Sequence, residues 1–153
     1  MNASMTETER VRRNTTPKVN ARIDRQIAET VYQFVGQPAS EITRRIDEIE
    51  REWDIERVLE TNASALALTG VGLAAAFTKR WLMLPAIVLG FLFMHGTQGW
   101  CPPVPLFRRV GVRTRSEIER ERFALKFLRG DFNEIIRDGA QLSSDALLSA
   151  LRR

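Results

Sequence analysis

The sequence predicts an all-α membrane protein, in which a two-span transmembrane helical hairpin has amphipathic helices before and after it. Within residues 61–100 only Lys79 and Arg80 are charged, and they divide this segment into two uncharged runs. The flanking segments are rich in charge and repeat apolar residues every three or four positions, which is typical of helices. No 100-residue stretch alternates strand and helix patterns, so a large α/β enzyme domain is excluded.

The net charge of +4 is the sum of an uneven distribution. Residues 1–60 carry 10 basic and 12 acidic side chains, residues 61–100 carry two basic ones, and residues 101–153 carry 11 basic and 7 acidic ones. The single cysteine excludes an internal disulfide, and one cysteine with one histidine cannot complete a structural zinc site. We therefore expect no metal and no cofactor.

Residues 1–18 are polar, with three arginines close together, and we expect a disordered basic tail. No apolar run follows these arginines, so the segment is not typical of a secretory signal. A weak attachment to anionic lipid head groups is the functional alternative.

Residues 19–60 form the predicted amphipathic helical region. A first apolar stripe has helical spacing and ends before Gly36 and Pro38: Ile23, Ile27, Val31 and Phe34. A second helix, capped by Ser40, repeats its apolar residues at intervals of four, three and four: Ile42, Ile46, Ile49 and Trp53. We expect this stripe to pack on a neighbouring helix, and a helix lying flat on a membrane with Trp53 at the interface is the alternative.

Residues 61–100 form the predicted transmembrane hairpin. The uncharged runs Ala63–Phe77 and Trp81–Gly96 extend with their uncharged neighbours to about 26 Å of helix, slightly less than a hydrocarbon core of about 30 Å. Two such runs in tandem, joined by a basic turn and closed by Trp81 and Trp100, favour membrane spans. A buried soluble helix pair is the alternative, but the remaining chain offers too little apolar surface to cover it.

Small residues recur along the first span, where close helix packing drives association in lipid. The predicted packing residues form two pairs four positions apart: Ala63 with Ala67, and Gly72 with Ala76. Their partner is either the second span or a second copy of the chain.

The basic residues predict the orientation of the hairpin. Eight arginines lie close to the membrane on the side of the two termini, and two basic residues lie in the turn, which predicts cytoplasmic termini.

Residues 101–153 are the predicted cytoplasmic C-terminal helical region. Three prolines at 102, 103 and 105 prevent the second span from continuing, and Thr114 with Glu117 forms a capping-box pattern for a helix that ends near Arg129. One face of this helix is expected to be cationic: Arg113, Arg115, Arg120, Arg122, Lys126 and Arg129. Two short helices are expected at 131–137 and 144–151.

The segment Gly99–Thr114 resembles the signature of the YgaP-like inner-membrane domain family, a two-helix hairpin of unknown function. The matching residues are Gly99, Trp100, Cys101 and Pro102 at the end of the hairpin, followed by Gly111 and Thr114. The resemblance covers about residues 55–115 and implies an integral protein of a bacterial inner membrane. Two departures are the longer distance from Cys101 to Gly111 and the long charged helices in place of a short entry segment.

Some members of that family carry a fused rhodanese domain, which moves sulfane sulfur. This chain has no such domain, so the resemblance implies no sulfurtransferase activity. For the hairpin alone the family implies no established activity.

Cys101 is the candidate for catalysis, as a nucleophile or persulfide carrier whose thiolate Arg108 and Arg109 would favour. Such chemistry normally needs an activating base or a second thiol, and the sequence offers only His95, six residues earlier. A packed structural cysteine is therefore the preferred interpretation. His95 is also the weak candidate for ligating the iron of a haem or the magnesium of a chlorophyll, against an interfacial histidine without a ligand.

The preferred functional hypothesis is a small non-catalytic membrane protein that acts as an interaction module, either self-assembling or as an accessory subunit of a larger membrane complex. Its expected partners are the lipid bilayer and itself or other membrane subunits, and not nucleic acid, because Glu117, Glu119 and Glu121 interrupt the basic residues. One alternative is a thiol-dependent sulfur carrier or redox protein that uses Cys101. Another is peripheral binding of anionic lipid by the C-terminal cationic helix.

Overall fold

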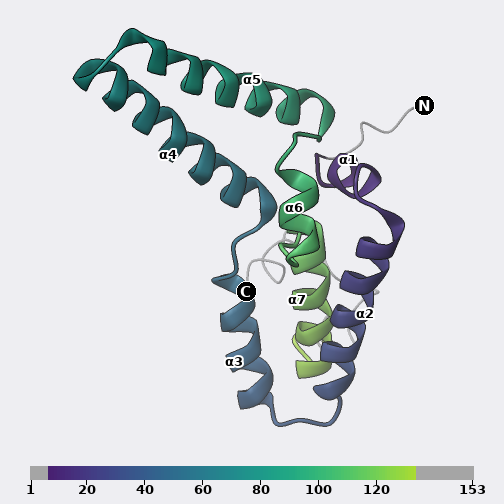
Figure 1. Cartoon of the computed structure of the whole chain (residues 1–153). Coiled ribbons are helices and arrows are strands. Elements are labelled where there is room, and N and C mark those ends of the chain that lie inside the picture. The colour runs from purple at the N-terminus through teal and green to yellow at the C-terminus, as the bar shows by residue number, and fades with distance from the viewer. Residues whose placement is uncertain (1–6, 134–153) are drawn as a thin grey trace, which may run out of the picture. The chain divides into compact units, whose positions relative to one another are not determined.

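The protein is all-helical over the residues that the computed structural model describes, 7–133. Helix accounts for 78% of these residues, and they contain no strand. In chain order the elements are α1 (Glu7–Arg13), α2 (Pro17–Gln33), α3 (Ala39–Glu50), α4 (Ile55–Ala76), the 3₁₀ turn η1 (Lys79–Leu82), α5 (Met83–Gln98), α6 (Val104–Arg109) and α7 (Arg115–Arg129) (Figure 1). The predicted all-α class is confirmed.

The chain divides into two compact units, with the divisions inside α2 and α7. The hairpin unit contains the residues up to Gln26 together with Glu52–Ile118. The α3–α7 unit contains Ile27–Arg51 together with the residues from Glu119 onward. Each unit is described by itself below.

Helices α4 and α5 lie side by side as an antiparallel pair joined through η1 (Figure 1). The backbone N–H of Arg57 donates to the Asp54 side chain at 2.9 Å, which caps the start of α4. Pro85 lies in the first turn of α5, where its missing N–H breaks no helical hydrogen bond. At about 1.5 Å per residue, the 22 residues of α4 extend about 33 Å, which exceeds the thickness of a hydrocarbon core.

Two helical stretches are long and apolar enough to cross a membrane. They are Ala39–Ala76, which contains α4, and Lys79–Gln98, which joins η1 to α5, and only 11% of the apolar window of each is buried. The exposed large apolar side chains between residues 61 and 100 belong to both arms and their connection: Leu66, Leu68, Val71, Phe77, Trp81, Leu82, Met83, Ile87, Leu89, Phe91, Phe93 and Trp100. A surface of this composition favours lipid over water as its surroundings.

The contact between α4 and α5 depends on Gly70, which the sequence analysis did not select. A Cβ atom on Gly70 would lie 2.5 Å from Pro85 Cδ and 3.2 Å from Leu84 Cβ. Ala63 and Ala67 of the predicted packing set are half-buried, whereas Gly72 and Ala76 are exposed. Gly72 has open space around it, so this half of the set takes no part in the contact between the two spans.

The N-terminal region differs from the disordered tail that the sequence predicts for residues 1–18. Residues 7–13 form α1, and Val11 is fully buried, because apolar groups of the hairpin unit cover it.

The second predicted apolar stripe, Ile42 to Trp53, also differs from the structure at its end. Helix α3 ends at Glu50, so Trp53 lies outside it and is 44% exposed.

The α3–α7 unit has a small apolar interior and several ion pairs. Ile42, Ile46 and Ile49 of α3 are buried. Arg45 Nη2 lies 2.8 Å from Glu121 Oε1, and Arg129 Nη1 donates to Thr43 Oγ1 at 2.8 Å, so both contacts join α3 to α7. The predicted helix at 144–151 and most of that at 131–137 lie outside the described residues.

The close approach at Gly70 generates a prediction about stability. Gly70→Ala places a methyl group against Pro85, and overpacking of this kind costs about 1–3 kcal/mol. The matched control is Gly90→Ala on α5, where the space is open and the gain in helix propensity, up to about 1 kcal/mol, is not opposed. Unfolding by SDS titration in mixed micelles measures both variants. Equal stability of the two would contradict the packing role of Gly70.

Candidate functional site at the mouth of the hairpin

Most of the residues singled out in the sequence gather in the hairpin unit at the end of the hairpin opposite η1. We call this region the mouth and define it as α1, the first two turns of α4, the last turn of α5, the loop 99–103, α6 and the segment 110–117. The backbone N–H of Ile55 donates to the Arg113 carbonyl at 2.9 Å, and Arg113 Nε donates to Glu52 Oε1 at 2.7 Å. These contacts fasten the segment after α6 to the start of α4.

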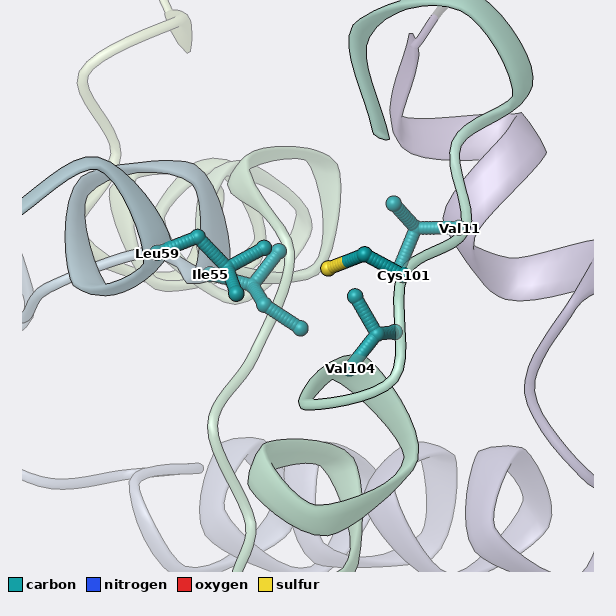
Figure 2. Packing of buried hydrophobic residues seen from close by; sticks show 5 residues of the cluster. All are labelled: Val11, Ile55, Leu59, Cys101 and Val104. Atoms are coloured by element: carbon teal, nitrogen blue, oxygen red, sulfur yellow. The ribbon is translucent and has the colours of Figure 1, made fainter. Parts of the chain in front are cut away.

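Cys101 lies inside an apolar cluster of the mouth. It is 3% exposed and packs with Val11 of α1, Ile55 and Leu59 of α4, and Val104 of α6. Figure 2 shows the Cys101 sulfur directed toward the α4 side chains, between Val11 and Val104. Burial raises the pKa of the Cys101 thiol, although a backbone hydrogen bond from Val104 acts in the opposite direction. Both the low exposure and the direction of the pKa disfavour a reactive thiolate.

The sequence analysis expected Arg108 to supply positive charge near the Cys101 thiol. In the structure, Arg108 forms an ion pair with the carboxylate of Glu117 instead. Its side chain is fully buried in a bidentate pair with Glu117, with Nη1 to Oε2 at 2.6 Å and Nη2 to Oε1 at 2.8 Å. The remaining guanidinium hydrogens go to Asn20 Oδ1 at 2.9 Å, the Val112 carbonyl at 3.1 Å and Thr15 Oγ1 at 3.3 Å. All five donors of the guanidinium therefore have acceptors.

Glu117 is the matching acceptor at the start of α7. It receives the Thr114 backbone N–H at 2.8 Å as well as hydrogen bonds from Arg108 and Arg12. Burial by itself would raise the pKa of Glu117, but the hydrogen bonds from Arg108 and Thr114 and the attraction of both guanidinium groups outweigh it. The pKa of Glu117 consequently lies below its ordinary value. The Glu117 half of the expected capping box is thus present.

Helix α1 covers the loop that follows α5. Arg10 Nη2 donates to the Gly96 carbonyl at 3.5 Å, and Asn14 Nδ2 donates to the Gln98 carbonyl at 3.2 Å. Gly99 has φ of +70°, and a Cβ there would collide with the Cβ atom of Arg10. Gly111 has φ of +98°. Both glycines of the family-like segment therefore occupy backbone conformations that other residues rarely adopt.

The remaining family-like residues lie around the same loop. Thr114 is fully buried, whereas Trp100 is 37% exposed and Pro102 is exposed. Cys101 and Thr114 are thus both buried in the mouth, whereas Trp100 lies near the surface. An exposed tryptophan at the end of a span is typical of a membrane interface.

His95 faces a pocket between the two arms at the mouth. The pocket has a volume of about 150 Å³ and is lined by Glu56, Glu60, Leu92, His95 and Gly96. His95 is 4% exposed, and both carboxylate oxygens of Glu56 are buried. The sequence indicates His95 as a candidate, but it does not indicate the two glutamates beside it; their spacing of four residues on one helix face was the available signal.

The structure also shows how the predicted cationic face is compensated. Arg113 pairs with Glu52, Arg122 with Glu119 and Arg129 with Asp131, and Lys126 is buried. The positive charge available to an anionic partner is therefore smaller than the sequence suggests.

Within residues 7–133, no group of three or more histidine, cysteine, aspartate or glutamate side chains has an arrangement that would hold a metal ion.

In comparisons with known proteins, no family model, no curated protein and no solved structure matches this chain. The resemblance of Gly99–Thr114 to the YgaP-like family therefore stays a prediction. What the fold defines is a helical protein with two helices able to cross a membrane.

The burial of Cys101 predicts slow modification of the native thiol. We expect alkylation by maleimide near neutral pH to be slow in the folded protein and fast after denaturation, because the sulfur is covered and its thiolate is disfavoured. Alkylation with quantification by intact mass measures both rates. Fast modification of the native protein would instead support a reactive Cys101.

The lowered pKa of Glu117 predicts a stability that falls in acid. A carboxylate with a lowered folded-state pKa contributes fully above its unfolded pKa, about 4.3, and the contribution decreases as the pH falls below that value toward the folded pKa. Glu117→Gln should lower stability and flatten this part of the pH profile, measured as the unfolding midpoint from pH 7 to pH 3. The control is Glu29→Gln at an exposed site, which should keep the wild-type slope. An unchanged slope in Glu117→Gln would contradict the assignment.

Proposed function

We propose that this chain is a non-catalytic integral membrane protein that acts as an interaction module, with the hairpin α4–η1–α5 inserted in the bilayer. The observation that carries the proposal is the exposed apolar surface of both arms, since only 11% of each apolar window is buried. In water this surface would be an aggregation hazard, whereas in lipid it is satisfied. The basic connection and the exposed Trp81 and Trp100 suit the two interfaces.

Self-assembly or assembly with a larger complex is the second part of the proposal. On α4, Gly72 and Ala76 point away from α5, with Ala65 on the same helix face. Small side chains allow two helix backbones to approach closely, which is the main source of helix association in lipid. The burial of Cys101 favours this interaction role over the sulfur-carrier alternative, and the compensated arginines favour it over the cationic lipid-binding alternative.

The test of insertion and assembly uses the full chain. We expect the protein to stay in the membrane fraction after an alkaline carbonate wash, and native mass spectrometry after gentle detergent extraction to give a multiple of 17.5 kDa or a stoichiometric foreign subunit. Gly72→Leu with Ala76→Leu should reduce the assembled fraction, because the larger side chains separate the helices. Gly90→Leu, at an open position on α5, is the matched control and should assemble normally.

Two outcomes would contradict this proposal at different points. Recovery of the chain in the soluble fraction would exclude membrane insertion. Unchanged assembly of the Gly72 and Ala76 double variant would exclude this face of α4 as the contact surface while leaving insertion in place.

A further inference from the structure

The outward side of α6 carries apolar side chains at positions where a helix in water would carry polar ones. Leu106 is 60% exposed, and Val110, directly after the helix, is 71% exposed. The backbone N–H of Val110 donates to the Leu106 carbonyl at 3.1 Å, so the helical turn continues and the two side chains lie on one face. Two positions further round the helix, Val104 and Arg108 are fully buried. The fold thus holds α6 with an arginine inside and two apolar side chains outside.

This helix lies level with the start of the first span. Val104 packs in one apolar cluster with Ile55 and Leu59 of α4, and the charged residues of α4 end at Glu60. Along the helix, Ile55 lies about 7.5 Å and Leu59 about 1.5 Å from Glu60. The head-group layer of a bilayer is roughly 5–7 Å thick on each side. This inference rests on the proposed membrane insertion, and in an inserted hairpin α6 begins within that layer.

The direction of α6 suits the same layer. After the loop 99–103, α6 runs across the direction of α5 (Figure 1). A helix in this orientation lies along the membrane surface, where amphipathic helices place their apolar face at the acyl chains and their charged side chains at the head groups. Rotation of α6 to cover Leu106 and Val110 would break the buried hydrogen bonds of Arg108, so the apolar face stays outside.

Positive charge borders this apolar face. Arg109 is exposed and forms no ion pair with another residue of the described range. Arg22 of α2 donates from Nη2 to the carbonyl of Arg109 at 2.7 Å and to that of Arg108 at 3.4 Å, which holds a second guanidinium at the end of α6. The arginines at 113 and 122 differ, because each is paired with a glutamate. An apolar face bordered by cations is complementary to acyl chains and phosphates.

We propose that the exposed face of α6 is a lipid contact surface. Leu106 and Val110 enter the acyl boundary of the bilayer, and Arg109 and Arg22 bind the phosphates of anionic phospholipids. A protein partner fits this face less well, since a stable protein interface covers about 800 Å² on each side and two apolar side chains supply a small part of that. For lipid the same two side chains extend the apolar surface that the inserted hairpin already presents. The helix then fixes the mouth against the membrane surface.

The experiment measures the surroundings of nitroxide labels on the full chain in vesicles of equal parts phosphatidylcholine and phosphatidylglycerol. The test positions are Leu106→Cys and Val110→Cys, and the matched control is Ser116→Cys, an exposed position on α7 in the same unit. Leu89→Cys on α5 reports insertion, and the wild-type chain gives any contribution of the buried Cys101. Oxygen concentrates in hydrocarbon, whereas a nickel complex stays in water. We expect the ratio of oxygen to nickel collisions to shift toward oxygen at 106 and 110 relative to 116.

Two results at positions 106 and 110 would overturn the proposal. Shielding of these labels from both reagents would assign the face to a protein contact, and nickel collisions as frequent as at 116 would assign it to water. The label at 89 separates the two levels of the argument. Oxygen collisions there would leave insertion in place and contradict this inference alone, whereas nickel collisions there would contradict insertion as well.

Lipid retention tests the charged part of the surface. Arg109→Gln should lower the retention of phosphatidylglycerol relative to phosphatidylcholine of the same acyl chains by about fivefold, the contribution of one basic side chain near an anionic surface. Native mass spectrometry in gentle detergent measures this ratio. The matched control is Arg51→Gln, an exposed arginine at the end of α3, which should keep the wild-type ratio. Equal ratios in the two variants would overturn the assignment of anionic head groups to Arg109.

Discussion

The buried pair of Arg108 and Glu117 is the constraint on which the rest of the mouth depends. Neither charge can be left alone in an apolar interior, since removing one partner of a buried pair typically costs about 3–5 kcal/mol. Five other groups therefore complete the hydrogen bonding of the two residues: Arg12 of α1, the Thr15 hydroxyl, Asn20 of α2, the Val112 carbonyl and the Thr114 amide. These hydrogen bonds to Arg108 and Glu117 hold α1, the start of α2 and the segment 112–114 in position.

This arrangement places the apolar and polar parts of the mouth in a defined order. Because Arg12 contacts Glu117, its neighbour Val11 is held against Cys101 and Ile55. Because α1 is held there, Arg10 reaches the Gly96 carbonyl at the end of α5. The charge cluster thus fixes both the covering of the thiol and the position of α1 against the end of α5.

The local features of this fold were predictable from sequence, whereas the contacts between distant segments were not. The uncharged runs on either side of Lys79 predict the hairpin, and Thr114 with Glu117 predicts the start of α7, because both signals come from neighbouring residues. Nothing near Arg108 in the sequence indicates Glu117 as its partner. Arg10 and Arg12 resemble part of an exposed basic tail for the same reason, since their acceptors lie 12 to 105 residues away. Of the pocket, only His95 was recognised.

The separation between α1 and its acceptors also has a consequence for biosynthesis. Arg10 meets Gly96 across 86 residues, and Arg12 meets Glu117 across 105. During translation the first helix therefore leaves the ribosome long before Gly96 and Glu117, and these two contacts cannot form until both α4 and α5 have been made. The mouth can close only when synthesis has passed α6 and reached Glu117, so Arg10 and Arg12 lack these two distant acceptors until both helices of the hairpin have been made.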